Sequence, residues 1–227
     1  MQRWSRPSKA WLRAAIDWPT VAKLYFRYGA MNSGKSTALL QAAYNYEERG
    51  QRVLLAKPHV DTKGEDQILS RLGVTRTVDF LIQPGESAMG LFKRHSTGDD
   101  PEALLEHVDA QPVACLLVDE AQFLETGQVD DLLRIAVLLD VPVMAYGIRT
   151  DFRTRSFPGS ERLMELAHTL EELKTICRCG RKALFNTRKV GDDFVFEGDQ
   201  VAIDGVAVTY ESLCAACYLR ESGGRLG

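Results

Sequence analysis

What this sequence lacks excludes several protein classes. Its 227 residues contain no apolar run of about 18 residues, so we expect no membrane-spanning helix. The first residues also lack the apolar stretch of about 7–15 residues that marks a secretory signal. Charge is nearly balanced, with 28 Lys and Arg against 31 Asp and Glu, which argues against a protein that coats duplex nucleic acid. We therefore expect a cytoplasmic globular protein with no membrane or nucleic-acid partner.

Cysteine is scarce, and its placement is more informative than its number. Four of the five cysteines form two close couplets, Cys177 with Cys179 and Cys214 with Cys217. Such couplets are typical of metal ligands in a reducing compartment, whereas a disulfide framework scatters its cysteines. Four thiolates make a closed tetrahedral set, so we predict a structural zinc ion. The alternatives are four buried cysteines or a redox pair. Cys115 lies in an apolar run and is expected in the core.

The first 22 residues differ from the rest in composition. They hold all three tryptophans, Trp4, Trp11 and Trp18, and four basic residues against one acid. This pattern fits either an amphipathic helix that docks on a membrane surface or partner, or a poorly ordered extension. We favour the extension, because a coherent strand begins only at Lys23.

From residue 23 onwards, short apolar runs alternate with helical patterns. Strands are expected at 24–28, 53–56, 78–82, 113–118 and 141–146, and helices at 36–49, 129–139 and 160–170. This alternation predicts an α/β fold with βαβ units and a mainly parallel sheet. We place a domain boundary near Leu173. The expected parts are an extension (1–22), a core (23–172), a small metal-binding lobe (173–221) and a tail (222–227).

Residues 29–36, GAMNSGKS, match the phosphate-loop pattern G-x-x-x-x-G-K-[ST] between an expected strand and an expected helix. Backbone N–H groups of such a loop close on phosphate oxygens, and the helix N-terminus favours the same negative charge. Lys35 is expected to reach the β- and γ-phosphates, and Ser36 to hold Mg²⁺. A glycine turn with an exposed lysine is the alternative. The predicted ATP-binding residues here are Gly29, Ala30, Met31, Asn32, Ser33, Gly34, Lys35 and Ser36.

Two adjacent acids, Asp119 and Glu120, follow the apolar run 113–118. The carboxyl ends of parallel strands face the ligand crevice, so both side chains should meet the nucleotide. Asp119 fits a magnesium role through a water molecule, and Glu120 fits a general base on the attacking hydroxyl or water. A helix cap is the alternative. The run DEAQ is also similar to helicase boxes, but helicases of that kind need two such domains and this chain has room for one.

Three motifs and the four-cysteine lobe, in this order, make the chain similar to the type II thymidine kinases. The motifs are the phosphate loop, DEAQF at 119–123 and YGIRTDF at 146–152, and the C-x-C-G form at 177–180 resembles the proteobacterial branch. The resemblance covers about residues 22–221. It implies a P-loop core with a zinc ribbon. It also implies transfer of the ATP γ-phosphoryl group to the 5′-hydroxyl of thymidine in nucleotide salvage, with deoxyuridine as a second acceptor. A homotetramer inhibited by dTTP is implied as well.

The resemblance further implies roles for individual residues. Glu120 would take the proton of the 5′-hydroxyl, and Asp61 would line the phosphate site. Asp119, Ala121 and Gln122 would complete the ATP site. The segment 148–157 resembles the family's lasso loop, which closes over the nucleoside. The residues implied at the nucleoside are Met31, Phe123, Ile148, Phe152, Phe157, Gln200, Val201, Ala202, Ile203, Asp204 and Tyr210.

A second hypothesis is a zinc-ribbon P-loop ATPase that acts as a switch on nucleic acid or a partner. It predicts a basic, aromatic-rich ribbon, but residues 173–221 carry several acids among their lysines and arginines. A third hypothesis, a regulatory nucleotide-binding module without turnover, is disfavoured by Glu120 at the end of the Asp119 strand. The sequence therefore favours a deoxynucleoside kinase that uses Mg²⁺ with ATP and holds a structural Zn²⁺.

Overall fold

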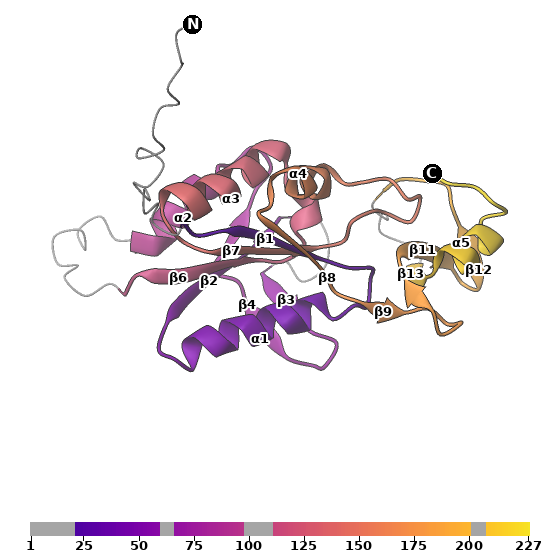
Figure 1. Ribbon diagram of the computed structural model, residues 1–227, viewed down its shortest axis with the longest axis horizontal. Helices are drawn as coiled ribbons and strands as arrows, with labels where there is room; N and C mark the ends of the chain where they lie inside the picture. Colours follow the sequence, from indigo (N-terminus) through magenta and orange to yellow (C-terminus); the bar gives the residue numbers. More distant parts are fainter. Residues whose placement is uncertain (1–20, 60–65, 98–110, 201–207) are drawn as a thin grey trace, which may run out of the picture.

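A six-stranded parallel sheet organises the computed structural model, which describes residues 21–59, 66–97, 111–200 and 208–227 (Figure 1). The strand order is β5-β2-β6-β7-β1-β8, and every neighbouring pair is parallel. This arrangement confirms the predicted α/β class. The strands are β1 (Leu24–Tyr28), β2 (Arg52–Pro58), β5 (Phe80–Ile82), β6 (Val113–Val118), β7 (Val143–Gly147) and β8 (Thr169–Glu172).

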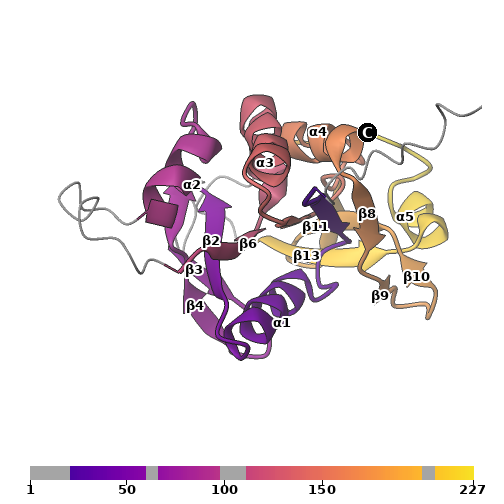
Figure 2. The same cartoon turned by 60° about the vertical axis from the view of Figure 1, so that its left-hand side comes forward.

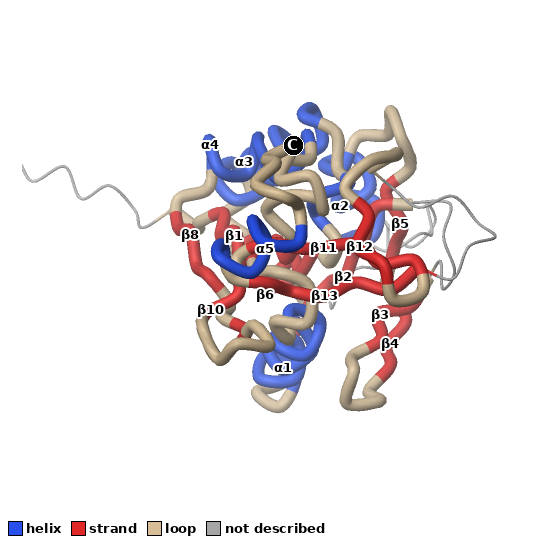
Figure 3. Tube along the Cα trace, turned by 90° about the vertical axis from the view of Figure 1, so that its right-hand side faces the viewer, coloured by secondary structure: helices blue, strands red, loops and turns tan. Residues whose placement is uncertain are grey.

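Helices cover both faces of the sheet (Figures 1 and 3). Helix α1 (Lys35–Glu47) packs Leu39 and Ala43 into a cluster that also holds Cys115, which is fully buried as predicted. The opposite face carries α2 (Ala88–Thr97), α3 (Thr126–Leu138) and α4 (Pro158–Leu166) over a larger apolar cluster. Successive residues of a strand enter opposite clusters, as the period of two requires, so the sheet is buried on both sides.

Helix α3 begins three residues before the predicted start at Val129. Glu125 and Gln128 form a capping box, in which each side chain bonds the backbone of the other. This arrangement satisfies N–H groups that the first turn leaves without partners. The prediction was late because it used the apolar pattern alone.

The helix predicted at 160–170 is wrong at both ends. Helix α4 starts at Pro158, whose fixed φ suits the first turn, and ends at Leu166. Residues 169–172 instead form the edge strand β8 along β1. Ser160, predicted as the cap, donates from Oγ to the carbonyl of Ile148 at 2.6 Å. The pairing with β1 overrides the local helical pattern of this segment.

Beyond the parallel sheet lies a C-terminal lobe, which we define as residues 175–221. It sits at one end of the molecule, beside the carboxyl ends of the central strands (Figures 1 and 2). Its main part is a three-stranded antiparallel sheet of order β12-β11-β13. Its elements are β9 (Thr175–Ile176), β10 (Lys182–Ala183), β11 (Phe185–Val190), β12 (Asp193–Val195), β13 (Val208–Leu213) and α5 (Ala215–Glu221).

Short elements complete the fold. The hairpin of β3 (Gln67–Leu69) and β4 (Thr75–Thr77) and the 3-10 helix η3 (Ala121–Phe123) were not predicted, because they are too short to show a period. None of the helices in the described ranges is long and apolar enough to cross a membrane. The predicted extension covers residues 1–22, and residues 1–20 of it lie outside the described residues. The boundary near Leu173 stays a prediction.

Candidate active site

The carboxyl ends of β1, β6 and β7 open into one cavity of about 1110 Å³. The loop after β1 is the predicted phosphate loop, the turn after β6 carries the two acids, and the loop after β7 is the arginine-rich segment 148–157. In a parallel sheet these loops share one edge, which explains why motifs distant in the sequence meet here. The C-terminal lobe contributes Asn186, Gln200 and Tyr210 to the lining of this cavity.

The phosphate loop has the turn geometry that its motif predicts. Asn32 and Gly34 have left-handed φ values of 66° and 78°, and α1 starts immediately afterwards at Lys35. The Lys35 ammonium donates to the Ala30 carbonyl at 3.0 Å. Burial lowers the pKa of Lys35, while the nearby carboxylates of Glu120 and Asp119 oppose this shift. The loop therefore presents a helix N-terminus and a partly desolvated cation to an anionic ligand.

Ser36 and Asp119 form a polar pair at the base of the cavity. The Ser36 hydroxyl donates to Asp119 Oδ2 at 3.1 Å. Burial, and next the charge of Glu120, raise the pKa of Asp119 to about 7. A hydroxyl beside a buried carboxylate offers the hard oxygen ligands that Mg²⁺ prefers. These residues fit a magnesium ion, whose charge would also lower the pKa of the carboxyl again.

Glu120 adopts an unusual backbone conformation at the cavity wall. Its φ of 49° lies in the left-handed region, which a glutamate rarely occupies. Gln122 fixes its side chain, because Gln122 Nε2 donates to Glu120 Oε2 and Gln122 Oε1 accepts the N–H of Ile148 at 3.2 Å. A side chain at Gly147 would come within 2.7 Å of Gln122 Oε1, so the glycine makes room for this amide. The carboxylate is thus held in place from the loop after β7.

Aromatic side chains form the apolar part of the cavity. Phe123 and Phe157 meet edge to face, with ring centroids 5.3 Å apart. Phe152 is buried, and the guanidinium of Arg188 stacks on its ring at 3.8 Å. Arg188 also donates to the Gln200 carbonyl at 3.1 Å and lies 5.9 Å from the ring of Tyr210. Such apolar walls with a few fixed polar groups suit a planar ligand.

The structure brings most of the predicted site residues together. Fourteen of them line the cavity: Met31, Asn32, Gly34, Lys35, Ser36, Asp119, Glu120, Gln122, Phe123, Ile148, Phe152, Phe157, Gln200 and Tyr210. Gly29, Ala30 and Ser33 belong to the phosphate loop behind this surface, and Ala121 packs in the apolar core of the α3 face. Five predicted residues lie outside the described ranges: Asp61, Val201, Ala202, Ile203 and Asp204.

Asn186, Arg188 and Ser212 of the C-terminal lobe were not predicted as site residues, and neither were several cavity-lining residues of the core, among them Lys57, Arg71 and Asp151. Asn186 and Arg188 on β11 pair in register with Ser212 and Tyr210 on β13. Alternate residues of a strand share a face, so these four side chains face the site together. The prediction of Tyr210 could have led to Ser212, two residues later. No predicted site residue pointed to Asn186 and Arg188 on β11, because strand pairing cannot be read from the sequence alone.

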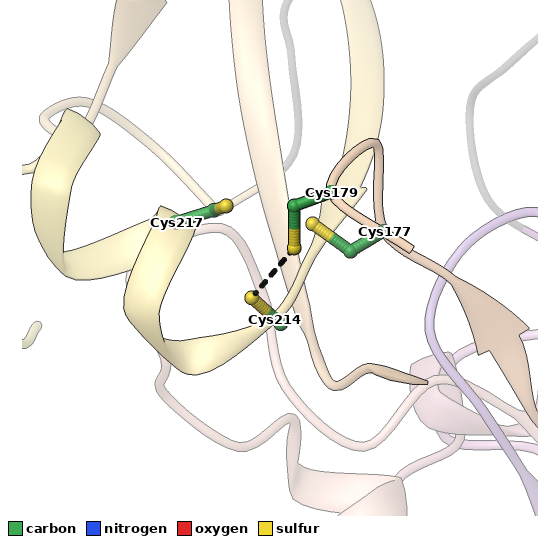
Figure 4. A group of neighbouring side chains, drawn as sticks. All are labelled: Cys177, Cys179, Cys214 and Cys217. Carbon is green, nitrogen blue, oxygen red and sulfur yellow. Dashed lines mark hydrogen bonds between the residues drawn. The ribbon is translucent and has the colours of Figure 1, made fainter. Parts of the chain in front are cut away.

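The four predicted metal ligands converge within the lobe (Figure 4). Their sulfur atoms all lie within 4.8 Å of one another, and Cys179 Sγ lies 3.6 Å from Cys214 Sγ. A tetrahedral ion with sulfur at about 2.3 Å requires sulfur separations of about 3.8 Å. Three of the cysteines are buried, and Cys179 is exposed. The cluster fits a four-coordinate metal ion with no open position.

Comparisons with known proteins agree with this geometry. A family model described as thymidine kinase matches residues 22–218. The thymidine kinase of Ruegeria pomeroyi is 43% identical over 205 residues, 89% of this chain and 96% of the relative. That of Mesorhizobium japonicum is 46% identical over 205 residues, 89% and 94% of the two chains. That of Legionella pneumophila (strain Paris) is 44% identical over 209 residues, 91% and 92%. This chain belongs to the thymidine kinase family.

Proposed function

We propose that this protein transfers the γ-phosphoryl group of ATP to the 5′-hydroxyl of thymidine, giving dTMP and ADP. The observation that carries the proposal is one cavity that joins a phosphate loop, two strand-end acids and an aromatic-walled pocket. The family adds the substrate class, since its members described above are named thymidine kinases. Deoxyuridine is proposed as a second acceptor.

Glu120 is proposed as the general base. Its carboxylate lines the same cavity as the phosphate loop and the aromatic residues and is close enough to Lys35 to affect its pKa, which supports a role where a 5′-hydroxyl would meet the γ-phosphoryl group. Gln122 engages Oε2 and so fixes the orientation of the carboxylate. Because Gln122 is itself bonded to Ile148 of the segment 148–157, that segment orients the base together with the pocket. A positioned base of this kind contributes about 10²–10⁴-fold to a rate.

Lys35 and Ser36 are proposed to handle the triphosphate. Lys35 now donates to a loop carbonyl, and a bound β- or γ-phosphate would replace that acceptor. Ser36 and Asp119 would hold Mg²⁺, which neutralises charge on the phosphates when bound. On the nucleoside side, Phe123, Phe152 and Phe157 would exclude water around the base.

The cysteine cluster is proposed to hold a structural Zn²⁺. Four sulfurs at these separations leave no place for a water molecule, so the ion would fold the lobe and take no part in chemistry. Thiolate ligands also support a reducing compartment, and we propose a cytoplasmic location. A homotetrameric state and feedback inhibition by dTTP are proposed from the family resemblance.

The test is an assay of the purified protein with Mg²⁺-ATP and each of the four deoxynucleosides. We expect phosphorylation of thymidine, and a loss of about 10²–10⁴-fold in kcat for Glu120→Gln. The matched control is Glu125→Gln, which removes a nearby acid that does not line the cavity and keeps an oxygen for the α3 cap. ATP hydrolysis that is indifferent to every nucleoside would overturn the proposal in favour of the ATPase switch.

A further inference from the structure

Two buried polar side chains of the C-terminal lobe contact the phosphate loop, and the chemistry above does not use them. Asn186 on β11 and Ser212 on β13 are cross-strand neighbours, so their side chains leave the same face. They are only 3% and 6% exposed. A buried polar group costs free energy unless it is hydrogen-bonded, so their partners indicate what they stabilise.

Both side chains bind the backbone of Met31. Asn186 Oδ1 accepts the Met31 N–H at 2.6 Å, and Ser212 Oγ donates to the Met31 carbonyl at 2.5 Å. Thr175 Oγ1 donates to the next carbonyl, that of Asn32, at 3.3 Å. The two peptide groups that flank Met31 are therefore oriented from outside the phosphate loop. Their orientation decides which N–H groups of the loop point at the phosphates.

The other end of the Asn186 amide reaches a different loop. Asn186 Nδ2 donates to the Thr150 carbonyl at 2.9 Å. Only one orientation of the amide satisfies both contacts, because the Met31 N–H needs the oxygen and the Thr150 carbonyl needs the nitrogen. Thr150 lies in the segment 148–157, two residues before Phe152. One buried side chain thus joins the phosphate loop to the segment that walls the apolar pocket.

We propose that Asn186 is a positioning residue that couples ATP binding to nucleoside binding, while Ser212 supports the ATP side alone. When either ligand orders its own loop, the Asn186 amide holds the other loop in its binding conformation. The second ligand then loses less conformational entropy on binding, which is positive coupling between the two sites. This inference rests on the proposed function, because it assumes that the two loops bind these two substrates.

Calorimetry tests the coupling directly. Thymidine is titrated into the full chain with and without a Mg²⁺-bound, non-hydrolysable ATP analogue. We expect the analogue to tighten thymidine binding by about fivefold or more in the unchanged protein. In Asn186→Ala we expect this factor to fall to about one. In Ser212→Ala we expect the factor to persist, and the KM for ATP to rise about fivefold because the Met31 carbonyl loses its partner.

Two further variants separate positioning from general damage to the lobe. Thr187→Ala removes a buried hydroxyl from the opposite face of β11, where it donates to the Glu211 carbonyl at 2.8 Å, and should leave the coupling unchanged. Asn186→Asp has nearly the same shape and keeps the acceptor for Met31, but it sets an oxygen against the Thr150 carbonyl. It should lose the coupling even if the alanine variant does not fold.

Unchanged coupling in both Asn186 variants, no coupling in the unchanged protein, or its loss in Thr187→Ala would each overturn the inference. The kinase assay keeps this outcome distinct from the proposed function. A protein that phosphorylates thymidine with uncoupled sites contradicts only the role of Asn186. A protein that does not phosphorylate thymidine contradicts the proposed function.

Discussion

The parallel-sheet core and the C-terminal lobe are stabilised in different ways. The core buries two apolar clusters, one on each face of its sheet, with residues such as Leu132 and Leu117 fully enclosed. The apolar cluster of the lobe has six buried members, and three of these are cysteines of the proposed metal site. A region with so little core usually needs a metal or another cross-link to fold.

The comparison shows that the C-terminal lobe, the region with the smaller apolar core, positions the loops of the site. The core supplies the groups proposed to act on the phosphates, Lys35, Asp119 and Glu120. The lobe supplies Asn186, Ser212 and Arg188, which hydrogen-bond or stack on the loops around them. Loss of the proposed metal should therefore disturb the site through the lobe, although none of the four cysteines lines the cavity.

The largest expected effect comes from removing a metal ligand. In Cys214→Ser, zinc content should fall well below one per chain and kcat/KM should drop by about 100-fold or more, because the lobe no longer holds the site loops. Helical circular dichroism should persist, since α1 to α4 belong to the core. The measurements are metal analysis, turnover and circular dichroism on the same sample. Full turnover without metal would show that the two regions are independent at the site.

A smaller side chain in the core should lower stability and leave zinc content and turnover unchanged, the opposite of the effect of Cys214→Ser. Leu132→Ala empties a fully buried position in α3, and should lower the free energy of unfolding by about 2–5 kcal/mol. Zinc content and kcat at 25 °C should remain near those of the unchanged protein. Denaturant unfolding, metal analysis and the kinase assay check this. If Leu132→Ala released zinc, the lobe would depend on the core as well.

Alkylation of the five cysteines should detect the opening of the lobe and the opening of the core separately. Alkylation of the native protein followed by mass spectrometry should label none of them, because the metal protects four and burial protects Cys115. A chelator should expose four sites, and denaturant the fifth. Labelling of Cys115 after chelation alone would show that the core opens when the lobe loses its metal.

The smallest expected effect is a pH dependence specific to the core. Burial raises the pKa of Cys115 to about 12, against an ordinary value of 9.0. The unfolded chain therefore loses this proton first, and the stability associated with Cys115 is present below pH 9 and lost as pH rises towards 12. Cys115→Ala should remove this slope, up to about 1.4 kcal/mol per pH unit. Unfolding curves between pH 8 and 10.5 test it, and parallel curves for the two proteins would contradict it.

The core could be predicted from the sequence because its signals are local. The phosphate loop is eight consecutive residues, and β6 is one unbroken apolar run that ends at Asp119. Both predict structure without knowledge of distant segments. The cysteine cluster was predicted for a similar reason, since each couplet is local and metal chemistry supplies the remaining geometry.

Most of what the sequence did not predict depends on pairing between distant segments. Thr169 and Leu170, the first two residues of β8, fell in the predicted helix but form a strand along β1. Asn186 and Ser212 acquire their positions from the register of β11 with β13, which no motif encodes. The capping box of α3 is a local signal that the prediction overlooked.

The left-handed backbone of Glu120 has a consequence for stability. Most residues with a Cβ lose roughly 1–2 kcal/mol in this conformation, whereas glycine has no Cβ and asparagine can offset the cost with local hydrogen bonds of its short side chain. Replacing Glu120 by either residue would then make the fold more stable while removing the proposed base. The conformation at Glu120 therefore places the proposed chemistry and the stability of the fold in opposition at a single residue.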